Sequence, residues 1–123
     1  MNALTLELHT LAAEIQATGI PATADPSRVL SLLATSDVVA VVDPTTSYTP
    51  ITFGLDFDLV VPVWLITAGP YDLAAVERLD GALMAVWLVA RPTETATRAT
   101  YEAADAAMPA LLIPTRRHVD CSP

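Results

Sequence analysis

The stretch Ile51–Thr67, ITFGLDFDLVVPVWLIT, alternates in polarity with a period of two along much of its length. Successive side chains of a β-strand point to opposite faces of a sheet, so this pattern predicts either two strand segments or one long bent strand. The even-numbered side chains are polar up to Asp58 and apolar from Val60, so the first half of this face should be exposed to solvent and the second half buried. The odd-numbered side chains should all face a core: Ile51, Phe53, Leu55, Phe57, Leu59, Val61, Val63 and Leu65.

Pro62 lies inside this predicted strand and has no N–H group to donate to a neighbouring strand. It therefore predicts a sheet edge or a bulge. One layer of helices can cover the odd face. On the even face, Val60 and Trp64 should contact either the helix predicted after Asp72 or a neighbouring subunit.

Two segments have the periodicity of amphipathic helices. The first has Asn2 as its expected N-cap, and Gly19 followed by Pro21 as its stop signal. The second begins after Asp72, which suits an N-cap and the positive end of the helix dipole. Its polar face vanishes over Leu83–Val89, so its last turns should be covered on all sides or continue into a strand.

The remaining segments complete the predicted fold. Ser27–Ser36 is either a short helix capped by Ser27 or a loop that packs, and Asp43–Pro50 has the composition of a turn. Further strands are predicted at Val38–Val42, Thr95–Ala103 and Leu111–Val119. We expect a single α+β domain over residues 1–123, with two helices packed on one mostly antiparallel sheet of four to five strands that includes one long strand.

Composition favours an oligomer and disfavours several classes of protein. Apolar residues make up 53% of the chain and charged residues 16%, which is more apolar surface than a monomer readily hides. No run reaches the roughly 18 apolar residues of a membrane span, and no basic region opens a signal peptide. We expect a soluble protein, intracellular when made. Its net charge of −8 disfavours binding to phosphates, and Cys121, alone, offers no disulfide framework.

Few residues suggest chemistry. Asp56 and Asp58 share one strand face and could form a paired-carboxylate or cation site, but their expected role is to keep that face wet. His9 and His118 lack a third ligand within sequence reach. Nucleophile and phosphate-loop motifs are missing. We therefore predict no catalytic residue, no cofactor and no metal, and a protein that is not an enzyme.

Short motifs at the ends of these elements extend over nearly the whole chain: Gly19-Ile20-Pro21, Ala24-Asp25-Pro26, Val41–Pro44, Phe57–Trp64, Pro70–Leu73, and Met108–Leu111 before a strand with Arg116 and Arg117. Their layout resembles the tail terminator family of long-tailed (siphovirus-type) bacteriophages, in particular those infecting actinobacteria. Ser27–Ser36 departs from the short proline-rich link of that family.

The resemblance implies a virion protein, assembled in the host cytoplasm, that forms a hexameric ring at the head-proximal end of the tail tube. Such a ring stops tube polymerisation and joins the tail to the head. Its partners would be copies of itself, the major tail tube protein and a head-completion or connector protein. Genomic DNA would pass through without specific binding, and no membrane is involved.

A ring of this kind predicts two sets of residues. Interface candidates are Tyr48, Val60, Trp64, Ile66, Arg116 and Arg117, with the segments Asp43–Pro50 and Asp120–Pro123 as further contact surfaces. Carboxylates that repel phosphates should line the channel, and the candidates are Asp56, Asp58, Glu94 and Glu102. Two alternatives remain open: a neck or head-completion protein, and a small intracellular enzyme or ligand-binding domain that uses Asp56 and Asp58.

Overall fold

The computed structural model describes residues 2–45, 47–51, 56–92 and 94–121. Its elements are α1 (Ala3–Gln16), β1 (Ala22–Thr23), the 3-10 helix η1 (Pro26–Arg28), α2 (Val29–Leu33), β2 (Val38–Val42), β3 (Ser47–Pro50), β4 (Asp56–Thr67), α3 (Leu73–Ala90), β5 (Thr97–Ala103) and β6 (Ala106–Asp120). The predicted α+β class is confirmed. The short α2 and the strands β1 and β3 are additional to the two helices and four to five strands that were expected.

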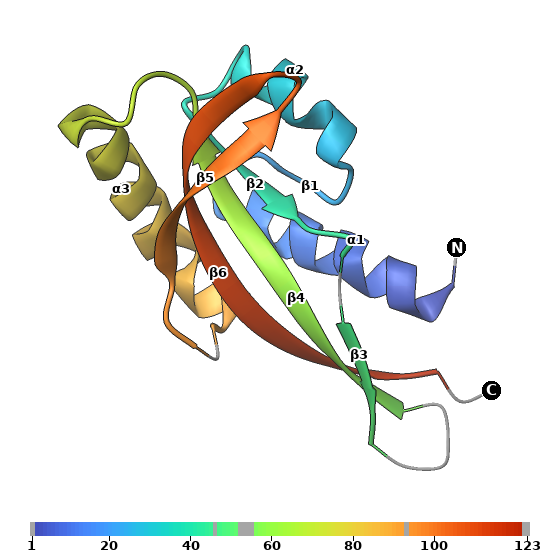
Figure 1. Ribbon diagram of the computed structural model, residues 1–123. Coiled ribbons are helices and arrows are strands. Elements are labelled where there is room, and N and C mark those ends of the chain that lie inside the picture. The colour runs from blue at the N-terminus through green and yellow to red at the C-terminus, as the bar shows by residue number, and fades with distance from the viewer. Residues whose placement is uncertain (1, 46, 52–55, 93, 122–123) are drawn as a thin grey trace.

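The sheet is mixed but mostly antiparallel (Figure 1). Its strand order is β1-β2-β4-β6-β5, and β3 pairs with β4 beyond the end of β2. Only β1 and β2 run parallel among the described strands. The long strand β4 is therefore central, with β6 along one side and β2 and β3 sharing the other.

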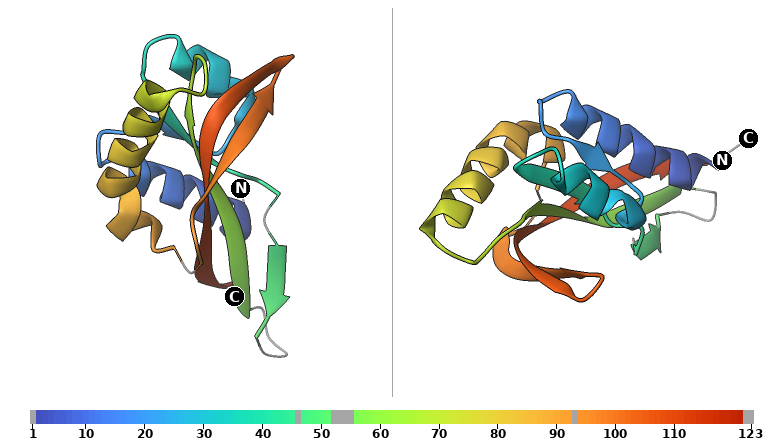
Figure 2. Two further views of the ribbon diagram at one scale, coloured as in Figure 1. Left: turned by 60° about the vertical axis from the view of Figure 1, so that its left-hand side comes forward. Right: turned by 90° about the horizontal axis from the view of Figure 1, so that it is seen from above.

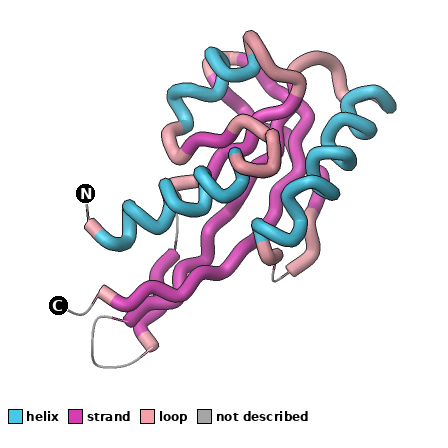
Figure 3. The backbone as a smooth tube through the Cα atoms, turned by 180° about the vertical axis from the view of Figure 1, so that it is seen from behind, coloured by secondary structure: helices cyan, strands magenta, loops and turns pink. Residues whose placement is uncertain are grey.

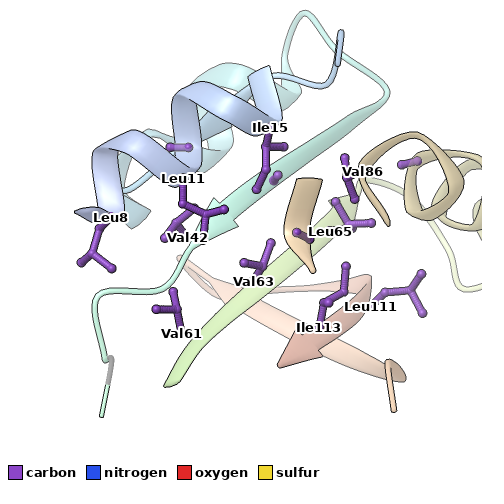
Figure 4. Close-up of a cluster of buried hydrophobic side chains, with 14 of the residues drawn as sticks. Leu8, Leu11, Ile15, Val42, Val61, Val63, Leu65, Val86, Leu111 and Ile113 are labelled. Atoms are coloured by element: carbon purple, nitrogen blue, oxygen red, sulfur yellow. The ribbon is translucent and has the colours of Figure 1, made fainter. Parts of the chain in front are cut away.

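Helices α1 and α3 lie across the same face of this sheet (Figure 3). The predicted N-caps are confirmed: Asn2 Oδ1 accepts the N–H of Thr5 at 2.8 Å, and Asp72 Oδ1 accepts that of Ala75 at 2.9 Å. The main core lies beneath these helices, and Figure 4 shows Leu11, Ile15 and Val86 directed toward the sheet. The odd side chains of β4 from Leu59 to Leu65 are fully buried there, as predicted.

The start of the predicted long strand differs from this pattern. Ile51 is 48% exposed, so its predicted place in the core is wrong. Phe53 and Leu55 lie outside the described residues. Phe57 is the first odd side chain of β4 to pack against the core, and it is partly buried.

A second, smaller cluster covers the upper half of the even face of β4. Its buried members are Val29, Val41, Ile66, Met108 and Ala110, with Trp64 and Tyr101 packed against them. The β5–β6 hairpin, which supplies three of these residues, curves away from α1 and α3 (Figure 2). The cover over Trp64 thus comes from α2 and β5 of the same chain, rather than from α3.

Pro62 marks a gap between two partner strands, although β4 is central. Its carbonyl oxygen accepts the N–H of Asp43 at 2.9 Å, so its main-chain groups face the β2 and β3 side. Val63 is the last residue of β4 that pairs with β2, and Val60 pairs with Ser47 of β3. By that register Asp43 lies opposite Pro62, which has no N–H to donate in return, so the β2 ladder ends here and the predicted interruption is a local edge.

Of the two alternatives for Ser27–Ser36, the short helix is confirmed by α2, but Ser27 does not cap it. Instead, Asp25 caps the preceding η1, where its carboxylate accepts the N–H of Ser27 at 3.0 Å. Two further predictions are wrong. The turn predicted over Asp43–Pro50 contains β3, because pairing with β4 outweighs local turn propensity. The last turns of α3 are helical to Ala90, and they are not covered: Met84 and Leu88 are 81% and 85% exposed.

Candidate assembly surfaces

The lower end of the sheet extends beyond α2 and α3 toward the C-terminus (Figure 1). We call this part the arm and define it as Ser47–Pro50, Asp56–Val61 and Thr115–Asp120. Its odd face packs under α1, where Leu59 is fully buried. By register, its even face presents rows of side chains from all three strands, such as Thr49, Asp58 and His118, or Ser47, Val60 and Arg116. Within the described residues no helix packs over this even face.

The lumen candidates Asp56 and Asp58 lie on the even face of the arm beside a histidine. His118 Nε2 is 3.6 Å from Asp56 Oδ1, and its Nδ1 is 3.8 Å from Asp58 Oδ1. The His118 side chain is 56% exposed. Arg116 is exposed on the same face, so this surface mixes acidic and basic groups.

Arg117 points to the opposite face from Arg116, as the alternation predicts. Its Nε donates to Glu7 Oε1 at 2.6 Å and its Nη1 to Glu14 Oε2 at 3.0 Å, and its side chain is 13% exposed. Burial acts to lower the pKa of Arg117, but hydrogen bonds and charge from Glu14 and Glu7 outweigh it, so the pKa is raised. This interface candidate ties α1 to β6 within the subunit.

Trp64 and Ile66 also hold the subunit together. Ile66 is fully buried, and Trp64 meets Tyr101 edge to face with ring centroids 5.3 Å apart. Trp64 Nε1 donates to Asp43 Oδ2 at 3.0 Å, while Asp43 Oδ1 accepts from the N–H and hydroxyl of Thr45, each at 2.8 Å. Burial and the charge of Asp43 raise the pKa of Tyr101. These contacts hold the connection between β2 and β3 in place.

The other two lumen candidates do not join Asp56 and Asp58. Glu94 is exposed in the loop after α3. Glu102 is exposed on β5 and pairs with Ala107, on the other face of the sheet by register. The carboxylates predicted for a channel are thus brought together only on the arm.

The strands β3 and β5 form opposite edges of the sheet, and each pairs with one strand among the described residues. The N–H of Ile51 donates to Asp56 of β4 at 3.2 Å. Alternate residues turn their main-chain groups to opposite sides, so the N–H of Tyr48, three residues earlier, points outward. On β5, a two-residue turn with positive φ at Ala104 and Asp105 fixes the register, and the N–H of Thr100 points outward.

Sequence reasoning missed an apolar surface on α3. Leu73, Met84, Trp87 and Leu88 are 73%, 81%, 44% and 85% exposed, and the last three border a shallow hollow of about 350 Å³ together with Leu83. A signal for it was present. The core-facing stripe of α3 is already complete in Ala75, Leu79, Ala82, Val86 and Ala90, so the further apolar residues had to face elsewhere.

Comparison of the chain with protein-family models, with curated proteins and with solved structures finds no match. Among the described residues, no helix has both the length and the apolarity needed to cross a membrane. In the same part of the chain, no group of three or more His, Cys, Asp or Glu side chains is arranged to hold a metal ion.

Proposed function

We propose that this chain is a structural protein of a long-tailed bacteriophage and forms a tail terminator ring at the head-proximal end of the tail tube. The observation that carries the proposal is the arm. Its uncovered even face presents Val60, Arg116 and the pair Asp56 and Asp58, and its edge strand β3 carries Tyr48, which is 48% exposed and lies on the opposite face by register. An exposed tyrosine and an exposed arginine are residue types enriched at protein interfaces.

The two sheet edges support a head-to-tail contact. An edge strand presents unpaired N–H and C=O groups and is a template for pairing with another chain. Placing β3 of one subunit beside β5 of the next would continue the sheet from subunit to subunit. Because the two edges differ, the contact is heterologous, and repetition of a heterologous contact closes a ring when the rotation allows it.

The charges on the subunit also suit a channel for DNA. Three of the six arginines have partners within the chain: Arg117 binds Glu7 and Glu14, Arg98 binds Asp80, and Arg78 binds Thr67. Arg117 and Arg98 are paired with carboxylates, Arg78 donates to a neutral hydroxyl, and the net charge of the chain is −8. In the proposed ring Asp56 and Asp58 line the channel and repel passing phosphates.

Electron microscopy and tube assembly test the proposal. The purified chain should form rings with a central opening. Added to its cognate tail tube protein during polymerisation, it should bind one end of each tube and shorten the tubes. Tubes of unchanged length with no ring at either end would contradict the proposed function.

The head-to-tail contact has its own test. Thr100→Pro and Tyr48→Pro each remove one outward N–H without removing a ladder hydrogen bond, and each should abolish rings while leaving a folded chain. Thr100→Val and Tyr48→Phe keep those N–H groups and should keep the rings. A mixture of the two proline variants should stop at heterodimers, because each variant retains one intact edge. Rings formed by either proline variant alone would exclude this contact.

The alternatives are separated by what the ring binds. A neck or head-completion protein should bind the connector and leave tube length unchanged. The contact of His118 with Asp56 and Asp58 favours the second alternative, a ligand-binding domain. In that case a ligand or metal screen should raise the melting temperature by mass action, and replacing Asp58 by Asn should remove the increase.

A further inference from the structure

The outward surface of α3 forms one continuous face. With 100° between successive residues, seven positions of α3 fall within about 60° of the direction of Met84. Together with the exposed C-cap Arg91, which follows the helix in a left-handed conformation, we call them the α3 face: Leu73, Glu77, Asp80, Gly81, Met84, Trp87, Leu88 and Arg91. The face lies away from the sheet, on the outside of the subunit (Figure 1). It has an apolar centre, acidic residues toward its N-terminal end, and Arg91 at its C-terminal end.

Gly81 has no explanation within the chain. It lies in the middle of α3, where glycine destabilises a helix relative to alanine. Gly81 does not have the positive φ that Gly19 and Gly69 have, and a Cβ built on it would meet no atom within 4 Å. Neither backbone conformation nor packing in the subunit requires glycine. The close approach of a second helix would.

The charges at the ends of the face are arranged symmetrically about its centre. Glu77 precedes Met84 by as many residues as Arg91 follows it, and both side chains are exposed. In an antiparallel pair of α3 helices centred on Met84, Glu77 of each copy meets Arg91 of the other. The same arrangement brings Leu88 of each copy over Gly81 of the other, where the missing side chain leaves room.

The α3 face is therefore complementary to itself. We propose that it binds a second copy of this chain, with the two α3 helices antiparallel about a two-fold axis at Met84. A contact of this kind is isologous and joins subunits in pairs. It goes beyond the proposed ring and does not depend on it, since a head-to-tail ring uses different surfaces.

The oligomeric state of the full chain in solution tests this proposal. Sedimentation equilibrium is measured over a wide concentration range in the Thr100→Pro background, which removes the proposed ring contact. We expect a monomer–dimer equilibrium. Leu88→Glu should weaken the dimer at least about tenfold in Kd, because it places a charge in the apolar centre. Leu30→Glu is the matched control, since Leu30 is also exposed, at 45%, but lies on α2; it should leave the Kd unchanged.

Two further variants address the geometry. Glu77→Arg should weaken the dimer by placing like charges together, and the double variant Glu77→Arg with Arg91→Glu should restore it. Gly81→Ala should raise the melting temperature of the Leu88→Glu monomer and yet weaken the dimer of the parent chain. A parent chain that stays monomeric at all concentrations would overturn the proposal. Equal effects of Leu88→Glu and Leu30→Glu on the Kd would also overturn it, as would a charge exchange that fails to restore the dimer. Because the ring contact is already removed in the Thr100→Pro background, these outcomes do not depend on whether the chain forms rings.

Discussion

Helices α1 and α3 pack on the same face of the same sheet, yet their outward faces differ. Both fill one core with a complete apolar stripe. The outward face of α1 carries polar residues such as His9 and Thr10, and its Glu7 and Glu14 bind Arg117 of β6. The outward face of α3 carries exposed apolar residues. The apolar periodicity of a helix therefore indicates which side packs on the sheet. The character of the opposite side follows from the residues that are not part of the core-facing stripe.

The buried stripes of the two helices should contribute alike. Ile15 of α1 and Leu79 of α3 are both fully buried in the main core. Replacing either by Ala should lower the free energy of unfolding by about 2–5 kcal/mol, since each change removes contacts and leaves a cavity. Urea denaturation followed by circular dichroism measures the loss. A loss well under 1 kcal/mol for one helix only would show that the two do not share one cooperative core.

The two helices should differ in how much their ion pairs contribute to the free energy of unfolding. Arg117→Met removes a largely buried guanidinium and leaves Glu7 without that partner, at a cost of about 1–3 kcal/mol in unfolding free energy. Arg98→Met removes the Asp80 pair of α3, in which the side chains are 45% and 47% exposed, and should cost under about 1 kcal/mol. Equal costs in the same denaturation experiment would contradict the distinction between a buried tie and an exposed one.

The N-caps should be equivalent. Asn2→Ala and Asp72→Ala each leave one helix N–H without its acceptor and should each cost about 1 kcal/mol. The thermal midpoint of each variant checks this, with Asn2→Ser and Asp72→Ser as controls that keep a capping oxygen. A control as destabilised as its alanine variant would assign the loss to another cause.

The smallest effect on folding is expected at the outward face of α3. Leu88→Gln should change the unfolding free energy of the isolated subunit by less than about 0.5 kcal/mol, because Leu88 is 85% exposed. The measurement belongs in dilute solution, where self-association contributes least. A loss of 2 kcal/mol or more would mean that Leu88 belongs to the core of the subunit.

Local patterns predicted the parts of the fold that depend on local sequence. Spacing and caps predicted α1 and the start of α3, and the β-branched run predicted β2 over its observed residues, Val38–Val42. The arm could not be predicted in this way. Pairing of Ser47–Pro50 with β4 turned an expected loop into a strand, and pairing depends on residues that are distant in sequence.

The candidate site residues divide in the same manner. The alternation of β6 correctly separated Arg116 from Arg117, but no local signal identified Glu7 as a partner 110 residues away. Trp64 was expected on a covered face, and its cover proved to be α2 and β5. The α3 face was missed because an apolar residue reads the same in a sequence whether it meets the sheet or the solvent.

The position of β6 has a consequence for folding during synthesis. It is the last of the described elements, yet it lies between β4 and β5 and supplies Arg117, the anchor of α1. While the ribosome is still translating β5, β4 lacks its longest partner, and its side chains lack the neighbours that β6 supplies. Contacts of such wide sequence separation form slowly, because a long loop must close first. The nascent chain should therefore stay open, and dependent on protection from aggregation, until residues 110–120 have emerged.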